Sequence, residues 1–158
     1  MDDTFTIRLA ALADIPTLVY HRHAMFLDSR AFDPADMAAH DAAFAQWAEE
    51  HMARDEFLTW LMTDGNGDVV AGVGIWLVNA LPIPGLRSSC RAYVLNVYTE
   101  PAFRRRGLAR RLMETSLAWC EQHGIEEVVL HASDAGRPLY EALGFAPTNE
   151  MCLRLNHA

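Results

Sequence analysis

Residues 93–113 read Tyr-Val-Leu-Asn-Val-Tyr-Thr-Glu-Pro-Ala-Phe-Arg-Arg-Arg-Gly-Leu-Ala-Arg-Arg-Leu-Met. The first six residues are β-branched, aromatic or apolar apart from one Asn, a composition typical of a strand. Pro101 has no backbone N–H and ends that strand. From Leu108 to Trp119 apolar residues return every three to four positions, which predicts a helix with one buried face, running to about Gly124. The unit is therefore a strand, a short arginine-rich turn and a helix, and the rest of the chain is arranged around it.

The turn lies where a helix begins. The first N–H groups of a helix have no partner within it and carry the positive end of its dipole, so they bind an anion. Gly107 has no Cβ and lets the backbone approach that anion closely. The chain carries a formal net charge of -8, yet five basic residues gather here: Arg104, Arg105, Arg106, Arg110 and Arg111. A basic cluster in an acidic protein indicates a specific anionic partner, and the acidic remainder would repel a nucleic acid.

Two common phosphate-binding motifs do not fit the turn. Gly107 is followed by Leu108, and the chain contains no lysine that could reach a terminal phosphate, which excludes a P-loop. The Gly-x-Gly at Gly72-Val-Gly74 stands inside a strand pattern and has no third glycine, so it is not a dinucleotide fingerprint.

Three segments resemble the GNAT superfamily of acyl-CoA-dependent N-acyltransferases. Residues 104–109 are similar to its pyrophosphate signature, Arg/Gln-x-x-Gly-x-Gly/Ala, between its fourth strand and third helix. Residues 138–145, Pro-Leu-Tyr-Glu-Ala-Leu-Gly-Phe, resemble its Leu-Tyr-x-x-x-Gly-Phe motif, and residues 7–16 resemble its first strand and helix start. The resemblance implies a mixed α/β fold with a mostly antiparallel sheet, splayed at a parallel pair between strands four and five and flanked by helices.

The patterns elsewhere in the chain predict the remaining elements. Before the central unit they are a strand at 4–10, a helix capped by Asp14 and running to about Leu27, a helix through 37–52, and a hairpin of strands 57–63 and 69–78. After a loop at 79–86 and the central unit come a short buried strand at 127–131, a helix at 136–143 closed by Gly144, and a last strand at 150–155.

Length and composition favour one domain over residues 1–158. No apolar run approaches the roughly 20 residues of a membrane span, and the acidic start, Met1-Asp2-Asp3, has the wrong charge for a signal peptide, so we expect a soluble, cytoplasmic protein. The three cysteines are far apart and predict no disulfide scaffold. His21 and His23 are two positions apart, which splays their side chains on a helix, and neither has a cysteine nearby, so we expect no metal.

The resemblance assigns the coenzyme A contacts by position. The pantetheine arm would pair with the strand backbone at Val97, Tyr98 and Thr99. Main-chain amides from Arg105 to Arg110, including those of Gly107, Leu108 and Ala109, would hold the pyrophosphate, and arginine side chains including Arg104 and Arg106 would face the adenosine phosphates. Ser133 or Asp134 would contact the pantetheine amides.

The expected reaction is direct attack of a neutral amine on the thioester carbonyl of acetyl-CoA. By resemblance Tyr140 is the general acid that protonates the leaving thiolate, because a phenol with a reference pKa of about 10 keeps its proton at neutral pH. A packing role for Tyr140, beside Leu139 and Leu143, is the alternative. The general base stays open: water relayed by Asn96, Tyr98 or Glu100, or a carboxylate from residues 28–36.

Two function classes follow. The first is an N-acetyltransferase acting on a primary amine of a small molecule or peptide, and the negative charge of the amino-terminal half favours a cationic acceptor. The second is a non-catalytic acyl-CoA-binding sensor or regulatory module. The acids at 28–41 either recognise the acceptor or merely keep that face soluble. We expect no nucleic-acid or membrane partner, and a homodimer through the last strand would be usual for the family.

Overall fold

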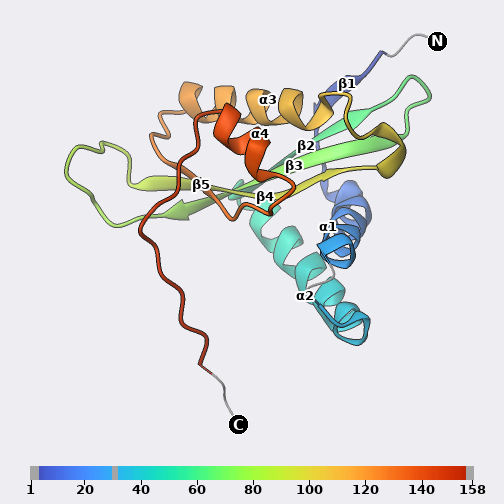
Figure 1. Cartoon of the computed structure of the whole chain (residues 1–158), viewed down its shortest axis with the longest axis horizontal. Helices are drawn as coiled ribbons and strands as arrows, with labels where there is room; N and C mark the ends of the chain where they lie inside the picture. The colour runs from blue at the N-terminus through green and yellow to red at the C-terminus, as the bar shows by residue number, and fades with distance from the viewer. Residues whose placement is uncertain (1–3, 30–31, 156–158) are drawn as a thin grey trace.

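The computed structural model describes residues 4–29 and 32–155, and leaves the amino-terminal Met1 to Asp3 outside the described residues. Five strands form one sheet in the order β1-β2-β3-β4-β5 (Figure 1): β1 Thr6–Leu9, β2 Phe57–Thr63, β3 Val69–Asn79, β4 Cys90–Thr99 and β5 Val128–Leu130. Neighbouring strands are antiparallel except β4 and β5, which are parallel. The mixed α/β sheet predicted from the sequence is confirmed.

Helices cover both faces of the sheet. Figure 1 shows α3 (Leu108–Gln122) and α4 (Arg137–Ala142) on one face, and α1 (Ile15–Ser29) and α2 (Pro34–Met52) on the other. Short 3-10 turns stand at Leu12–Asp14 and Pro101–Phe103. Asp14, predicted to cap the first helix, instead accepts from the Ala11 N–H at 2.8 Å and so closes the 3-10 turn before that helix.

Two apolar clusters hold these layers together, one on each face. Between the sheet and α3 the core includes Val94, Leu112 and Met113, all nearly inaccessible to solvent. Between the sheet and the α1–α2 pair the core is built on Leu18 and Phe44. Burial of these side chains is the main force that fixes the sheet between its helices.

A β-bulge interrupts β4 at Asn96. The register with β3 shifts between Gly72 and Gly74, and Asn96 adopts φ of 55°, in the left-handed region that Asn tolerates better than most residues. Leu95 packs in the core on the α1–α2 face, and the Asn96 side chain points to the same face, bonded to the Leu18 carbonyl of α1 at 3.2 Å. The bulge thus turns two consecutive side chains toward α1.

The parallel pair separates soon after it forms. Pairing between β4 and β5 ends at Val94 and Leu130, whereas β4 continues to Thr99. Residues 95–99 of β4 therefore present their backbone at an edge that β5 does not cover. This is the splay expected from the sequence.

Two sequence predictions need correction. Strand β5 is only half-buried, because it has a neighbour on one side alone and the α4 connection covers it incompletely. Residues 150–155 form no strand: they pair with no strand among the described residues, and Met151, Leu153 and Leu155 are 94%, 82% and 72% exposed. Alternating apolar residues make a strand only where an edge accepts them. The homodimer expected through this segment stays a prediction.

None of the helices within residues 4–29 and 32–155 is long and apolar enough to cross a membrane.

Candidate active site

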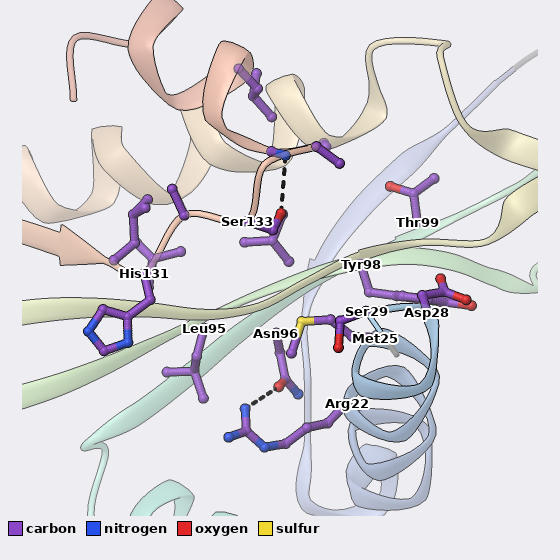
Figure 2. A pocket seen from close by; sticks show the side chains of 18 of the residues that line it. Arg22, Met25, Asp28, Ser29, Leu95, Asn96, Tyr98, Thr99, His131 and Ser133 are labelled. Atoms are coloured by element: carbon purple, nitrogen blue, oxygen red, sulfur yellow. Dashed lines mark hydrogen bonds between the residues drawn. The ribbon is translucent and has the colours of Figure 1, made fainter. Parts of the chain in front are cut away.

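A cavity of about 1220 Å³ opens where β4 and β5 separate. One end reaches the arginine-rich turn and the start of α3, and the other reaches the wall formed by α1 and α2 (Figure 2). Its volume exceeds that of most pockets for a single small molecule, which are roughly 300–1,000 Å³. The space therefore suits two ligands that meet at the splay.

The turn before α3 is a cradle of main-chain amides. Arg105 and Gly107 adopt φ of 63° and 77°, and alternation of left-handed residues in such a turn directs successive N–H groups to one side. The Arg111 N–H is the first to bond back, to the Gly107 carbonyl at 3.1 Å. The amides of Leu108 and Ala109 come before it and have no carbonyl partner in the described part of the chain. They line the cavity and are available to an anion.

The arginine side chains of this turn do not all face the cavity. Arg104 donates to the Thr99 carbonyl at 2.9 Å and to Asp28 at 2.6 Å, and this hydrogen bond to Asp28 raises the pKa of Arg104. It joins α1 to the end of β4 and lines the cavity while paired with Asp28, so its expected contact with a phosphate stays a prediction. Arg106 lies over the Phe103 ring and does not line the cavity. Arg105 and Arg110 do line it.

The uncovered edge of β4 forms the floor between the two ends. Val97, Tyr98 and Thr99, expected to pair with pantetheine, all line the cavity. Across the gap, Ser133 lines it after β5, with its Oγ accepting from the Gly136 N–H at 3.1 Å (Figure 2). Asp134 does not line the cavity.

Tyr140 reaches the cavity from α4. Its side chain is buried, with 8% of the residue exposed, and burial raises the pKa of its phenol. Among the described residues no group is within hydrogen-bond distance of its hydroxyl. The ring packs against Gly136, where an added Cβ would lie 2.8 Å from Tyr140 Cε2. The Tyr140 hydroxyl is therefore protonated and forms no hydrogen bond within the described part of the protein, as expected for a general acid that donates its proton to a ligand.

The residues predicted as candidate bases are placed less favourably. Glu100 lies outside the cavity and accepts from the hydroxyls of Tyr20 at 3.3 Å and Tyr98 at 3.4 Å. Burial is the main cause that raises the pKa of Tyr98. Asn96 lines the cavity but is 3% exposed, and its amide is held by α1. Glu100 thus lies outside the cavity, whereas Asn96 reaches it with an amide already bonded to α1, and a water relay through either residue stays a prediction.

The acids of the α1–α2 region have other partners. Asp33 caps α2 by accepting from the Ala35 N–H at 2.9 Å, and Asp41 contacts His23 at 2.7 Å. Of these acids only Asp28 lines the cavity, and it is paired with Arg104.

Sequence reasoning missed three residues of the cavity. Arg22 of α1 donates from Nη1 to Asn96 Oδ1 at 2.9 Å (Figure 2). The hydroxyl of Tyr93 lies 2.8 Å from Nδ1 of His131, and both residues line the cavity. Burial, first of all, raises the pKa of Tyr93, and the Glu150 charge adds to this. The sequence held one signal for Arg22, which is a charged residue in a helix whose other face is apolar. The pairing of Tyr93 with His131 had no local signal, because 38 residues separate them.

Within the described residues, no group of three His, Cys, Asp or Glu side chains is arranged to hold a metal ion.

Comparison with known proteins places this geometry in context. The model of the Acetyltransferase (GNAT) family matches residues 22–145. A GCN5-related N-acetyltransferase from Ralstonia eutropha JMP134 is 32% identical, with a TM-score of 0.90 over 96% of this chain and 99% of that chain. A predicted acetyltransferase from Clostridium acetobutylicum, crystallised with acetyl-CoA, is 26% identical, with a TM-score of 0.86 over 97% and 96% of the two chains. Glucosamine-6-phosphate N-acetyltransferase from Arabidopsis thaliana, at 18% identity and a TM-score of 0.68 over 97% and 99%, shares the fold. No curated protein matches the chain.

Proposed function

Because this chain belongs to the GNAT acetyltransferase family, we propose that it transfers an acetyl group from acetyl-CoA to a primary amine by direct attack on the thioester. The acceptor is a small amine that enters from the α1–α2 side of the cavity.

One observation carries the proposal. The uncovered β4 edge at residues 95–99 leads directly to the unpartnered amides at the start of α3. Coenzyme A needs both features, because its pantetheine amides need backbone partners and its diphosphate needs clustered N–H donors. The complex of the Clostridium acetobutylicum relative with acetyl-CoA supports the same co-substrate here.

The chemistry then divides between two sides of the cavity. The amine nitrogen forms a bond to the carbonyl carbon, the carbon–sulfur bond breaks, and the sulfur leaves with the electron pair. Tyr140 gives its proton to that sulfur, since its phenol stays protonated and its hydroxyl is not engaged by the protein. An N–H of the β4 edge stabilises the carbonyl oxygen as it gains charge.

Tyr93 and His131 together remove the proton from the substrate ammonium. In the tautomer that leaves Nδ1 of His131 unprotonated, Tyr93 donates to Nδ1, so when its oxygen accepts a proton from the ammonium, its own proton passes to the imidazole. His131 is exposed, so the proton leaves from the imidazole to solvent. Tyr93 and His131 replace Glu100 and Asn96 as the proposed route.

The test separates an enzyme from a binding module. Acetyl-CoA is incubated with a panel of amines, and free thiol is measured beside the thermal stability of the protein. Thiol release that depends on an amine supports the enzyme. Stabilisation by acetyl-CoA without thiol release from any amine would support the non-catalytic module instead. His131→Ala should lower kcat mainly below pH 8, where the amine is protonated, and equal losses at all pH values would exclude the relay.

A further inference from the structure

Arg22 is a cation held inside the cavity without a carboxylate. None of the ion pairs among the described residues includes Arg22. Its guanidinium lies between two rings, with Cζ 4.8 Å from the Phe26 centroid and 4.9 Å from the Phe44 centroid. Burial lowers the pKa of Arg22, as expected for a charge removed from water with no anion beside it.

The donors of this guanidinium are largely unused. Nη1 bonds to Asn96, which is neutral, whereas Nε is buried and has no partner. Among the described residues Nη2 has no acceptor either, and Arg22 lines the cavity. A guanidinium presents its N–H groups in a planar fork, and a carboxylate accepts two of them at once.

The surroundings do not supply that anion. Asp28, which lines the cavity, is already paired with Arg104 at 2.6 Å, and Asp41 of α2 is paired with His23 at 2.7 Å. The nearby His40 has a pKa lowered by burial and by the charge of Arg22. The positive charge at this end of the cavity is therefore unbalanced, and a cationic acceptor, as the sequence suggested, would meet repulsion.

The rest of the wall is apolar. Met25, Phe26, Phe44, Trp47 and Trp76 line the same end of the cavity. The ring centroids of Trp47 and Trp76 are 5.5 Å apart at 84°, an edge-to-face packing that keeps this wall rigid. A ligand that fits here has an apolar body as well as an anion.

We propose that the acceptor is an α-amino acid with an aliphatic or aromatic side chain, whose carboxylate binds Arg22. This rests on the function proposed above. The carboxylate of the acceptor must lie close to its reacting nitrogen. Arg22 bonds to Asn96 at the bulge, next to the β4 edge where the thioester is proposed to lie. Only one carbon separates the nitrogen and the carboxylate of an α-amino acid, so both groups fit between that edge and Arg22.

The experiment measures binding and turnover separately. Calorimetry on protein saturated with coenzyme A compares L-phenylalanine, L-methionine and L-alanine with their amides, which keep the shape and remove the negative charge. At least one acid should bind about ten- to a hundredfold more tightly than its amide, the range of a charge-assisted hydrogen bond. Arg22→Gln should abolish that preference and leave the affinity for coenzyme A unchanged, whereas Arg22→Lys should retain part of it. Arg54→Gln, at an exposed arginine that does not line the cavity, is the matched control and should keep the preference.

Each outcome decides the proposal. Equal or tighter binding of the amides by the native protein, or no binding of any pair, overturns it, and this comparison stands even where Arg22→Gln does not fold. A preference for the acids without thiol release would retain the carboxylate site and reject the acetyltransferase. Amine-dependent turnover with no preference for the acids would retain the acetyltransferase and reject the carboxylate site.

Discussion

Gly136 controls the position of the Tyr140 ring, and Gly136→Ala tests this control. Gly136 has φ of -84° and ψ of -23°, a conformation that alanine adopts readily, so the substitution causes no backbone strain. The added Cβ would lie 2.8 Å from Tyr140 Cε2 and 3.1 Å from Ser133 Oγ. Ordinary contact begins at 3.4 Å, so the ring must move by 3.4 − 2.8 = 0.6 Å.

The expected effect follows from that displacement. A misplacement of about 1 Å at a reacting group can cost roughly a hundredfold in rate. A shift of 0.6 Å should therefore lower kcat about tenfold. The KM for acetyl-CoA should change less than kcat, because the atoms nearest the added Cβ belong to Tyr140 and Ser133 and not to the amide cradle. Stability should change by less than about 1 kcal/mol, since alanine also restricts the unfolded chain.

A double-mutant cycle isolates the effect. Thiol release at saturating substrates is measured for native protein, Gly136→Ala, Tyr140→Phe and the double variant. Tyr140→Phe should lose roughly a hundredfold or more, as expected for loss of a general acid. In that background Gly136→Ala should cause little further loss. Gly65→Ala, in the turn between β2 and β3, is the control. Native kcat in Gly136→Ala, or the same tenfold loss in both backgrounds, would refute the reasoning.

The remaining predictions concern the cradle, the bulge and two titrating groups. Gly107→Val should abolish coenzyme A binding in calorimetry, because a β-branched residue strains φ of 77° and crowds the anion; native affinity would contradict the cradle. Asn96→Ala should unfold in urea about 1 kcal/mol more easily than Asn96→Gly, since only glycine relaxes φ of 55°; equal stabilities would exclude backbone strain there. His21 is 1% exposed, and its pKa is lowered by burial to about 4, from 6.5 in the unfolded chain. The unfolded state therefore binds the proton first, so stability should fall as pH drops from 6.5 towards 4, by about 2 kcal/mol at pH 5. His21→Asn should flatten that dependence, and an unchanged slope would assign the loss to other groups. Because burial raises the pKa of Tyr140, kcat should show no alkaline decline from this group below pH 10, and a decline that Tyr140→Phe removes would refute this.

Local features of the sequence determined the central unit and its cradle. A strand composition, a proline, a glycine and an apolar repeat act over a few residues, so they predict β4, the turn and α3 without knowledge of the fold. The motif around Tyr140 was identified by its resemblance to the family's motif, and the structure brings that residue to the cavity. The alternating tail at 150–155 had an equally regular pattern but formed no strand, because a strand needs a partner edge.

Only the tertiary structure decided which charges enter the site. Arg22 and Asn96 are 74 residues apart in the chain and meet because the bulge turns Asn96 toward α1. Arg104 lines the cavity paired with Asp28, a partner 76 residues distant. The direction of a long charged side chain depends on the nearest opposite charge or acceptor in space, and sequence spacing does not encode that partner. The anion cradle could thus be read from the chain, whereas the cation that selects the acceptor emerged only from the folded arrangement.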